Sequence, residues 1–248
     1  MTKQIAGKKE STEKERMAGK MKSSERKQGL VTDKFTVGYG KKVILSNVNL
    51  MAEPGRVLTL IGPNGSGKST ILKSIVKQLK SLGGVVYLNG KATSEMKEAE
   101  IAKSLSMVMT EHIHPELMSC RDVVATGRYP YTGRLGILDK QDWKLVDEAI
   151  TMVHAEEVAE QSFTRISDGQ RQRVMLARAI CQDTAILVLD EPTSYLDIRY
   201  KLDILNSIRK LARERNIAVM MSLHELDLVQ KVSDMVACVD GTTVSHIG

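Results

Sequence analysis

Apolar and polar positions along the chain fall into blocks that switch between the periods of strands and helices. Short apolar runs bounded by turn residues predict strands at 31–37, 43–49, 56–61, 85–88, 106–110, 185–189, 217–222 and 235–239. Longer periodic segments predict helices at 70–80, 94–105, about 119–162, 170–181, 198–215 and 224–232, with a loop at 127–136. Because strands alternate with helices, the pattern indicates an α/β fold built on a parallel sheet.

Composition narrows the class of protein. Hydrophobic residues make up 42% of the 248 residues and charged residues 27%, as in globular domains rather than disordered or fibrous chains. The apolar runs are far shorter than the roughly 20 residues that cross a bilayer, and the N-terminus lacks the apolar stretch of a secretory signal. Three widely spaced cysteines, Cys120, Cys181 and Cys238, argue against a disulfide framework or a cysteine-rich zinc site. They favour a reducing cytosol.

The first 29 residues differ from the rest of the chain. Residues 1–28 hold nine of the 36 Lys and Arg and four of the 30 Asp and Glu, so most of the net charge of +6 lies there. Few large apolar residues accompany them, which predicts a disordered basic tail at 1–29 and a folded domain at 30–248. Contact of the tail with anionic lipid headgroups is an alternative. Since the folded part is nearly neutral, we expect no nucleic-acid partner.

A glycine-rich segment follows the strand predicted at 56–61 and leads into the next helix. It fits the phosphate-binding pattern GxxxxGK[ST] and comprises Gly62, Pro63, Asn64, Gly65, Ser66, Gly67, Lys68 and Ser69. Thr70 follows directly and is also a candidate nucleotide-binding residue. Glycines let backbone N–H groups converge on one anion, and the helix N-terminus adds a partial positive charge. Lys68 would reach the β- and γ-phosphates of a nucleotide, and Ser69 would ligate Mg²⁺.

The apolar strand at 185–189 ends in two carboxylates, Asp190 and Glu191. Ligands of open parallel sheets bind at the carboxyl ends of the strands. Asp190 is therefore a candidate for holding Mg²⁺ through water, and Glu191 for polarising an attacking water. A solvated charged loop after a core strand is the alternative, and the phosphate loop makes it the weaker one.

A third segment, Ile166 to Gln170, begins a helix. From the residues alone it is a helix start, with Ser167 or Asp168 as the cap and Gln170 in the first turn. A hydroxyl and free N–H groups at a helix start can equally bind an anion. The sequence leaves both interpretations open.

The order of these segments resembles the ATP-binding-cassette (ABC) transporter ATPases. The phosphate loop is followed by Ile166–Gln170, Asp190-Glu191, Ser194–Asp197 and then His224, over about 31–248. The resemblance implies a P-loop NTPase core, an N-terminal antiparallel β part and an inserted helical part at about 95–165. Finer motifs, Asp190–Ile198 and Val124–Pro130, resemble the importers of iron–siderophore complexes, haem and cobalamin.

The resemblance also implies roles for individual residues. Tyr39 would stack on adenine, although from the residues alone it is an ordinary strand-end tyrosine. Glu191 would be the catalytic base, and His224 would contact the γ-phosphate. Lys68, Ser69 and Asp190 keep the phosphate and Mg²⁺ roles given above. Ser167, Gly169 and Gln170 would belong to the signature that meets ATP on a second subunit, and Asp197 to the loop joining the two sites.

The chain departs from the family pattern at four points. Thr110, followed by Glu111, stands where the family has a glutamine, Ile166 replaces a leucine, and Asp168 replaces a glycine. The chain also ends early relative to the family. The extra carboxylate of Asp168 is expected to oppose phosphate binding unless it turns away. His112 and His114 flank one residue and are more simply loop residues than metal ligands.

The resemblance implies ATP and Mg²⁺ as cofactors and a head-to-tail homodimer. Its further partners would be transmembrane permease subunits and, indirectly, a substrate-binding protein, which places the chain at the cytoplasmic face of the membrane. A non-transport ABC ATPase of cluster assembly, repair or translation is the main alternative. A cassette that binds ATP without coupling is a weaker one, suggested by Thr110 and Asp168.

Overall fold

A six-stranded sheet forms the centre of the molecule. The structure, a computed structural model, describes residues 28–109, 117–133 and 136–247. Its central strands follow the spatial order β11-β10-β4-β9-β8-β7, and all neighbours are parallel except β10 and β11. The strand bounds are β4 Val57–Ile61, β7 Leu105–Val108, β8 Ile186–Asp190, β9 Ala218–Ser222, β10 Met235–Val239 and β11 Val244–Ile247. The predicted parallel sheet is therefore confirmed.

A second sheet is antiparallel and comes mainly from the N-terminal part of the described chain. Its order is β2-β1-β5-β6, and β3 also pairs with β1. The bounds are β1 Leu30–Tyr39, β2 Lys42–Val48, β3 Met51–Ala52, β5 Gly83–Leu88 and β6 Lys91–Ala92. This sheet is the antiparallel part that the family resemblance implies.

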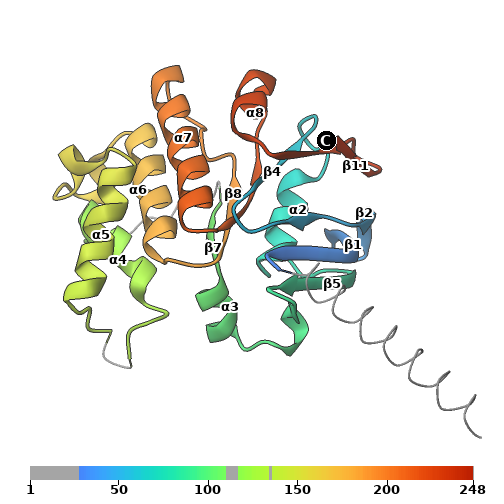
Figure 1. The fold of residues 1–248 in the computed structure, drawn as a ribbon, viewed down its shortest axis with the longest axis horizontal. Helices are drawn as coiled ribbons and strands as arrows, with labels where there is room; N and C mark the ends of the chain where they lie inside the picture. The colour runs from blue at the N-terminus through green and yellow to red at the C-terminus, as the bar shows by residue number, and fades with distance from the viewer. Residues whose placement is uncertain (1–27, 110–116, 134–135, 248) are drawn as a thin grey trace, which may run out of the picture.

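Seven α-helices are described, and they gather in distinct regions of the molecule. Figure 1 shows α4, α5 and α6 on one side of the central strands, with β1, β2 and β5 on the other. The helix α2 lies next to the antiparallel sheet, and α7 and α8 lie together. The bounds are α2 Lys68–Ile75, α3 Glu98–Ser104, α4 Cys120–Ala125, α5 Lys140–Met152, α6 Asp168–Cys181, α7 Ile198–Glu214 and α8 Leu226–Val232.

Two apolar clusters hold these layers together. One joins the helices α4 to α8 to one face of the central sheet, with Val146, Val174 and Leu189 among its buried members. The other packs α2 between the two sheets, where Ile71 and Leu72 are fully buried. The helix that follows the phosphate loop is thus covered on both sides, which fixes the loop at its N-terminus.

Several predicted helix bounds are wrong. The helix expected at 70–80 ends at Ile75, because the chain turns through Lys77, whose φ is 62°. The helix expected at 94–105 is broken at Met96, which is extended between a 3₁₀ turn and α3. The long helix expected to run to 162 ends at Met152.

Candidate functional site

The phosphate loop joins β4 to α2, and at two of its positions the backbone tolerates only glycine. Gly62 has a φ of 147°, and a Cβ there would lie 2.0 Å from the carbonyl oxygen of Val239. Gly67, at φ 104°, is the residue before α2, and a Cβ there would lie 2.8 Å from Leu45 Cδ1. The loop therefore curls tightly against a helix N-terminus, which is the geometry that binds a phosphate.

Lys68 lies across this loop and is almost fully buried. Its Nζ donates to the carbonyl oxygens of Gly62, at 2.8 Å, and Pro63, at 3.0 Å. Burial lowers the pKa of Lys68, and the negative charges of Glu191 and Asp190 act in the opposite direction. A cation held within the loop is placed to pair with phosphate oxygens.

Asp190 and Ser69 meet at the carboxyl end of β8. Ser69 Oγ donates to Asp190 Oδ1 at 3.0 Å, and the Asp190 side chain is fully buried. Among the described residues, Asp190 Oδ2 is buried and has no hydrogen-bond partner. Mg²⁺ prefers hydroxyl and carboxylate oxygens and keeps several waters. The two side chains therefore fit a Mg²⁺ ion bound with nucleotide.

Glu191 follows Asp190 in a left-handed backbone conformation, with φ at 51°. Its Oε1 lies 2.5 Å from His224 Nε2, and its Oε2 accepts from Ser194 Oγ at 3.1 Å. The two residues predicted to be catalytic are thus in direct contact. Both side chains are about one-third exposed, so water reaches them.

Tyr39 completes one side of a hollow of about 560 Å³ beside the loop. Its ring is 53% exposed, and its hydroxyl lies 3.4 Å from Thr70 Oγ1. The hollow is lined by Tyr39, Ile44, Asn64, Gly65, Gly67, Lys68, Ser69, Thr70, Glu191 and His224. Residues predicted separately from four parts of the sequence therefore surround one space, with an exposed aromatic ring at its edge.

The residues of the signature segment do not line this hollow. Ser167 caps α6: its Oγ accepts from the Gln170 N–H, and Gln170 Oε1 accepts from the Ser167 N–H. Gly169 lies against the loop after β8, where a Cβ would be 3.1 Å from the Tyr195 carbonyl oxygen. Asp197 caps α7 by accepting from the Tyr200 N–H at 3.1 Å. Within one chain, these four residues act as helix caps and packing residues.

Of the residues that depart from the family pattern, the structure describes Asp168 and Ile166 but not Thr110. Asp168 forms an ion pair with Arg171, one turn along α6, so its carboxylate is matched by a cation. Ile166 is buried among the helices. Thr110, Glu111, His112 and His114 lie outside the described residues, as does most of the predicted tail at 1–29.

Sequence reasoning missed two hydroxyls of the site. Ser222 Oγ donates to Asp190 Oδ1 at 2.7 Å, and Ser194 Oγ donates to Glu191 Oε2 at 3.1 Å. Ser222 is the only polar residue of β9, at the strand's carboxyl end, and that position is the signal that could have identified it.

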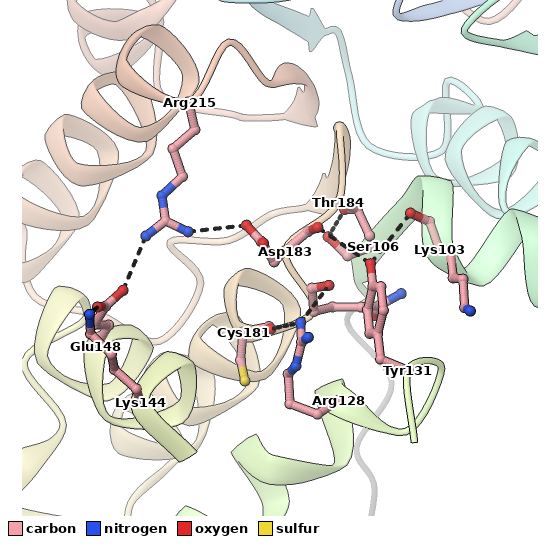
Figure 2. A network of polar contacts seen from close by, with 11 residues as sticks. Lys103, Ser106, Arg128, Tyr131, Lys144, Glu148, Cys181, Asp183, Thr184 and Arg215 are labelled. Atoms are coloured by element: carbon pink, nitrogen blue, oxygen red, sulfur yellow. Dashed lines mark hydrogen bonds and ion pairs between the residues drawn. The ribbon is translucent and has the colours of Figure 1, made fainter. Parts of the chain in front are cut away.

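Sequence reasoning also missed the role of the buried Arg128, which joins α5 to the end of α6. Its Nε donates to Asp142 Oδ1 at 2.8 Å, and its Nη1 to the carbonyl oxygen of Cys181 at 3.0 Å. Its guanidinium lies over the Tyr131 ring at 4.2 Å. Figure 2 shows Arg128, Tyr131 and Cys181 of this cluster at the end of α6. Residues 182–185 lead from there directly into β8. The cluster thus ties α5 to the end of α6 and to the connection that leads into the strand ending in Asp190.

The fold and this site define a P-loop nucleoside triphosphatase. Residues 45–194 match the ABC transporter family. The chain belongs to that family and is an ABC ATPase cassette. Among the helices that the structure describes, none is both long and apolar enough to cross a membrane.

Curated relatives cover most of the chain. An uncharacterized ABC transporter ATP-binding protein of Methanocaldococcus jannaschii is 43% identical over 219 residues, 88% of this chain and 76% of that protein. The iron(3+)-hydroxamate import ATP-binding protein of Bacillus subtilis is 38% identical over 88% of this chain and 81% of its own length. The ferric enterobactin transport ATP-binding protein of Escherichia coli is 32% identical, with shares of 86% and 79%.

Solved structures agree with the fold. The dimeric structure of a bacterial ABC transporter cassette has a TM-score of 0.77 and 26% identity, over 87% of this chain and 96% of that one. A dimeric post-hydrolysis state of a cassette bound to ADP and Pi has a TM-score of 0.77 and 25% identity, again over 87% of this chain and 96% of that one. The expected P-loop NTPase fold is confirmed.

Proposed function

We propose that this chain is the ATP-hydrolysing subunit of an ABC importer that takes up an iron complex, either a siderophore or haem, or cobalamin. The observation that carries ATP hydrolysis is the gathering of Lys68, Ser69, Asp190, Glu191 and His224 around one loop. The cargo class is supported by relatives whose names specify import of iron(3+)-hydroxamate and ferric enterobactin.

Within this proposal the loop residues 62–70 bind the triphosphate, and Tyr39 stacks on the adenine ring. When bound, Mg²⁺ neutralises phosphate charge, and Ser69 and Asp190 are the residues that would hold it. Glu191 orients and deprotonates the attacking water, because its carboxylate is held from both sides by Ser194 and His224. Lys68 and the backbone N–H groups stabilise the charge that develops on the phosphate.

A second subunit completes the site in this proposal. Ser167, Gly169 and Gln170 lie at the N-terminus of α6, outside the hollow, where a hydroxyl and helix N–H groups can meet the γ-phosphate of ATP on a partner copy. Asp197 would connect the two sites. The dimeric form of a similar cassette supports this arrangement.

The remaining partners follow from the importer role. Permease subunits would bind the ATPase domain, residues 30–248, at the cytoplasmic face of the membrane, and a substrate-binding protein would deliver the cargo to them. The helical part at about 95–165 would carry the signature segment toward the second subunit.

Hydrolysis and dimer formation are tested together with Glu191→Gln. We expect this variant to bind ATP and to hydrolyse it on the order of 10²-fold more slowly, the scale for loss of a positioned base. Gel filtration with ATP should then show a trapped dimer, while Glu214→Gln, the same exchange at the exposed end of α7, should behave as wild type. Normal turnover together with a monomer in ATP would contradict both the role of Glu191 as the base and the head-to-tail dimer.

Cargo is tested in vesicles that contain this chain with its permease. Uptake of radiolabelled ferric hydroxamate should require ATP and should disappear with Lys68→Ala. If the purified chain hydrolyses ATP but ferric hydroxamate, haem and cobalamin all fail to enter, the importer role is wrong and a non-transport role is favoured.

A further inference from the structure

One buried hydroxyl lies between the two carboxyl residues at the end of β8. Ser222 is the last residue of β9 and is the register partner of Asp190 in the neighbouring strand. Its side chain is fully buried, and its Oγ donates to Asp190 Oδ1 at 2.7 Å. The same oxygen accepts from the Glu191 N–H at 3.0 Å. A single side chain thus holds the carboxylate of one residue and the backbone of the next.

The contact with Asp190 determines which carboxylate oxygen stays available. Ser222 and Ser69 both donate to Oδ1, while Oδ2 is buried without a partner among the described residues. Two donors on one oxygen fix the rotation of the carboxylate about its last bond. Oδ2 is consequently presented in one direction, with its lone pairs unused.

The contact with Glu191 fixes the backbone that aims the second carboxylate. A left-handed φ, here 51°, is unfavourable for any residue other than glycine unless its surroundings hold it. The hydroxyl of Ser222 accepts the N–H of this residue, and Gln172 Nε2 donates weakly to its carbonyl oxygen at 3.4 Å. The direction of the Glu191 side chain therefore depends on Ser222.

The position of Ser222 along the chain adds a third connection. His224, which contacts Glu191, comes two residues later, and the N–H of Leu223 between them donates to the Leu60 carbonyl oxygen at 3.2 Å. Leu60 lies in β4, which leads into the phosphate loop. The segment 222–224 is thus pinned to the strand that carries the loop.

We infer that Ser222 is a positioning residue for hydrolysis, whose hydroxyl sets the orientation of Asp190 toward Mg²⁺ and of Glu191 toward water. The inference rests on the roles proposed above for Asp190 and Glu191. Outer hydrogen-bond partners of metal-holding side chains typically change metal affinity or activity by about 10- to 100-fold when they are removed.

A buried hydroxyl can also serve stability alone, and a matched pair of variants separates the two roles. Threonine and valine have nearly the same branched shape, so Ser222→Thr and Ser222→Val make similar steric changes, but only threonine keeps the hydroxyl. Thr184 provides the control. It is buried at the opposite end of β8, where its Oγ1 donates to the Ile186 carbonyl oxygen at 2.8 Å, and Thr184→Val removes a buried hydroxyl far from the site.

The experiment uses the full chain and two readouts. The first is ATP turnover as a function of ATP and Mg²⁺ concentration. The second is Mn²⁺ binding in the presence of ADP, followed through the electron paramagnetic resonance signal of free Mn²⁺, which requires no turnover. For Ser222→Val we expect kcat to fall about tenfold or more and Mn²⁺ affinity to fall severalfold, with ATP affinity in EDTA within about twofold of wild type. Ser222→Thr should restore both.

The outcomes are distinguishable. If Ser222→Val matches Thr184→Val in turnover and Mn²⁺ affinity, or if Ser222→Thr is as defective as Ser222→Val, the inference is wrong. If Asp190→Asn and Glu191→Gln themselves leave turnover unchanged, the site assignment fails instead. If Asp190→Asn and Glu191→Gln lose turnover while Ser222→Val keeps it, the role of Ser222 is rejected and the site assignment stands.

Discussion

Replacing Arg128 with alanine should destabilise the protein strongly, because this guanidinium has four partners in a place with little water. Its ion pair with Asp142 joins side chains that are 9% and 13% exposed. Removing one member of such a buried pair typically costs about 3–5 kcal/mol, since the other charge is left unpaired. The carbonyl oxygens of Cys181 and Gln182 and the ring of Tyr131 lose their partner as well. We expect a loss of about 3–5 kcal/mol in the free energy of unfolding.

Urea unfolding of a double-mutant cycle measures this loss. The set comprises Arg128→Ala, Asp142→Ala and the double variant. Because removing Asp142 also removes the stranded carboxylate, the double variant should be less destabilised than the sum of the single variants, by about 1–3 kcal/mol. Lys210→Ala is the matched control: its ion pair with Glu214 joins side chains that are 72% and 64% exposed. That change should stay within about 0.5 kcal/mol.

The reasoning would be refuted by a loss under about 1 kcal/mol for Arg128→Ala, the range of exposed pairs. Strict additivity in the cycle would equally show that the pair with Asp142 is not what holds the helices in place. Arg128→Lys should recover only part of the loss, since an ammonium cannot match the forked contacts of a guanidinium.

Three further predictions follow from the same structure. Lys68→Ala should abolish ATP turnover in a phosphate-release assay, because the charge of the β- and γ-phosphates goes unpaired; normal turnover would overturn the loop assignment. Gly62→Ala should abolish nucleotide binding measured by titration calorimetry, since its Cβ would lie 2.0 Å from the Val239 carbonyl oxygen, and unchanged affinity would contradict the loop geometry. Burial acts to raise the pKa of Asp142, but the hydrogen bonds from Arg128 and Asp139 outweigh it and hold the pKa below the ordinary 3.8. The stabilisation from this carboxylate should therefore be present above pH 3.8 and disappear as the pH falls through the lower pKa of the folded state. In urea unfolding, Asp142→Asn should remove that part of the acid dependence of stability. An acid dependence identical to that of the wild type would count against the Arg128–Asp142 ion pair.

The parts of the site that the sequence predicts are those encoded by neighbouring residues. The glycines and Lys68 form a local pattern, and an apolar strand that ends in two carboxylates locates Asp190 and Glu191. Their positions in the parallel sheet follow from the alternation of strands and helices.

The contacts that orient these residues could not be predicted in this way. Ser69 and Ser222 are 121 and 32 residues from Asp190 in sequence, and they meet only because β4, β9 and β8 are neighbours. Strand order determines such contacts, and periodicity carries no information on strand order.

Helix ends were missed for a local reason. The apolar period continues past Ile75, yet the backbone turns at Lys77, where the Leu79 N–H donates to the Lys73 carbonyl oxygen. Neither glycine nor proline marks this turn, so the residues gave no stop signal. The partner of Asp168, by contrast, lies only three residues away in Arg171, and the helix spacing alone could have suggested it.

The short connection between α6 and β8 limits how this region can change its length in evolution. Ser167 at one end and Glu191 at the other are joined by a helix, residues 182–185 and a strand, with Arg128 fastened to the connection. An inserted or deleted residue within 182–185 would rotate or shift one end relative to the other and would detach Arg128 from its carbonyl oxygens. Homologous chains should therefore vary in length at surface turns such as that between β10 and β11, and hardly at all between Ser167 and Glu191.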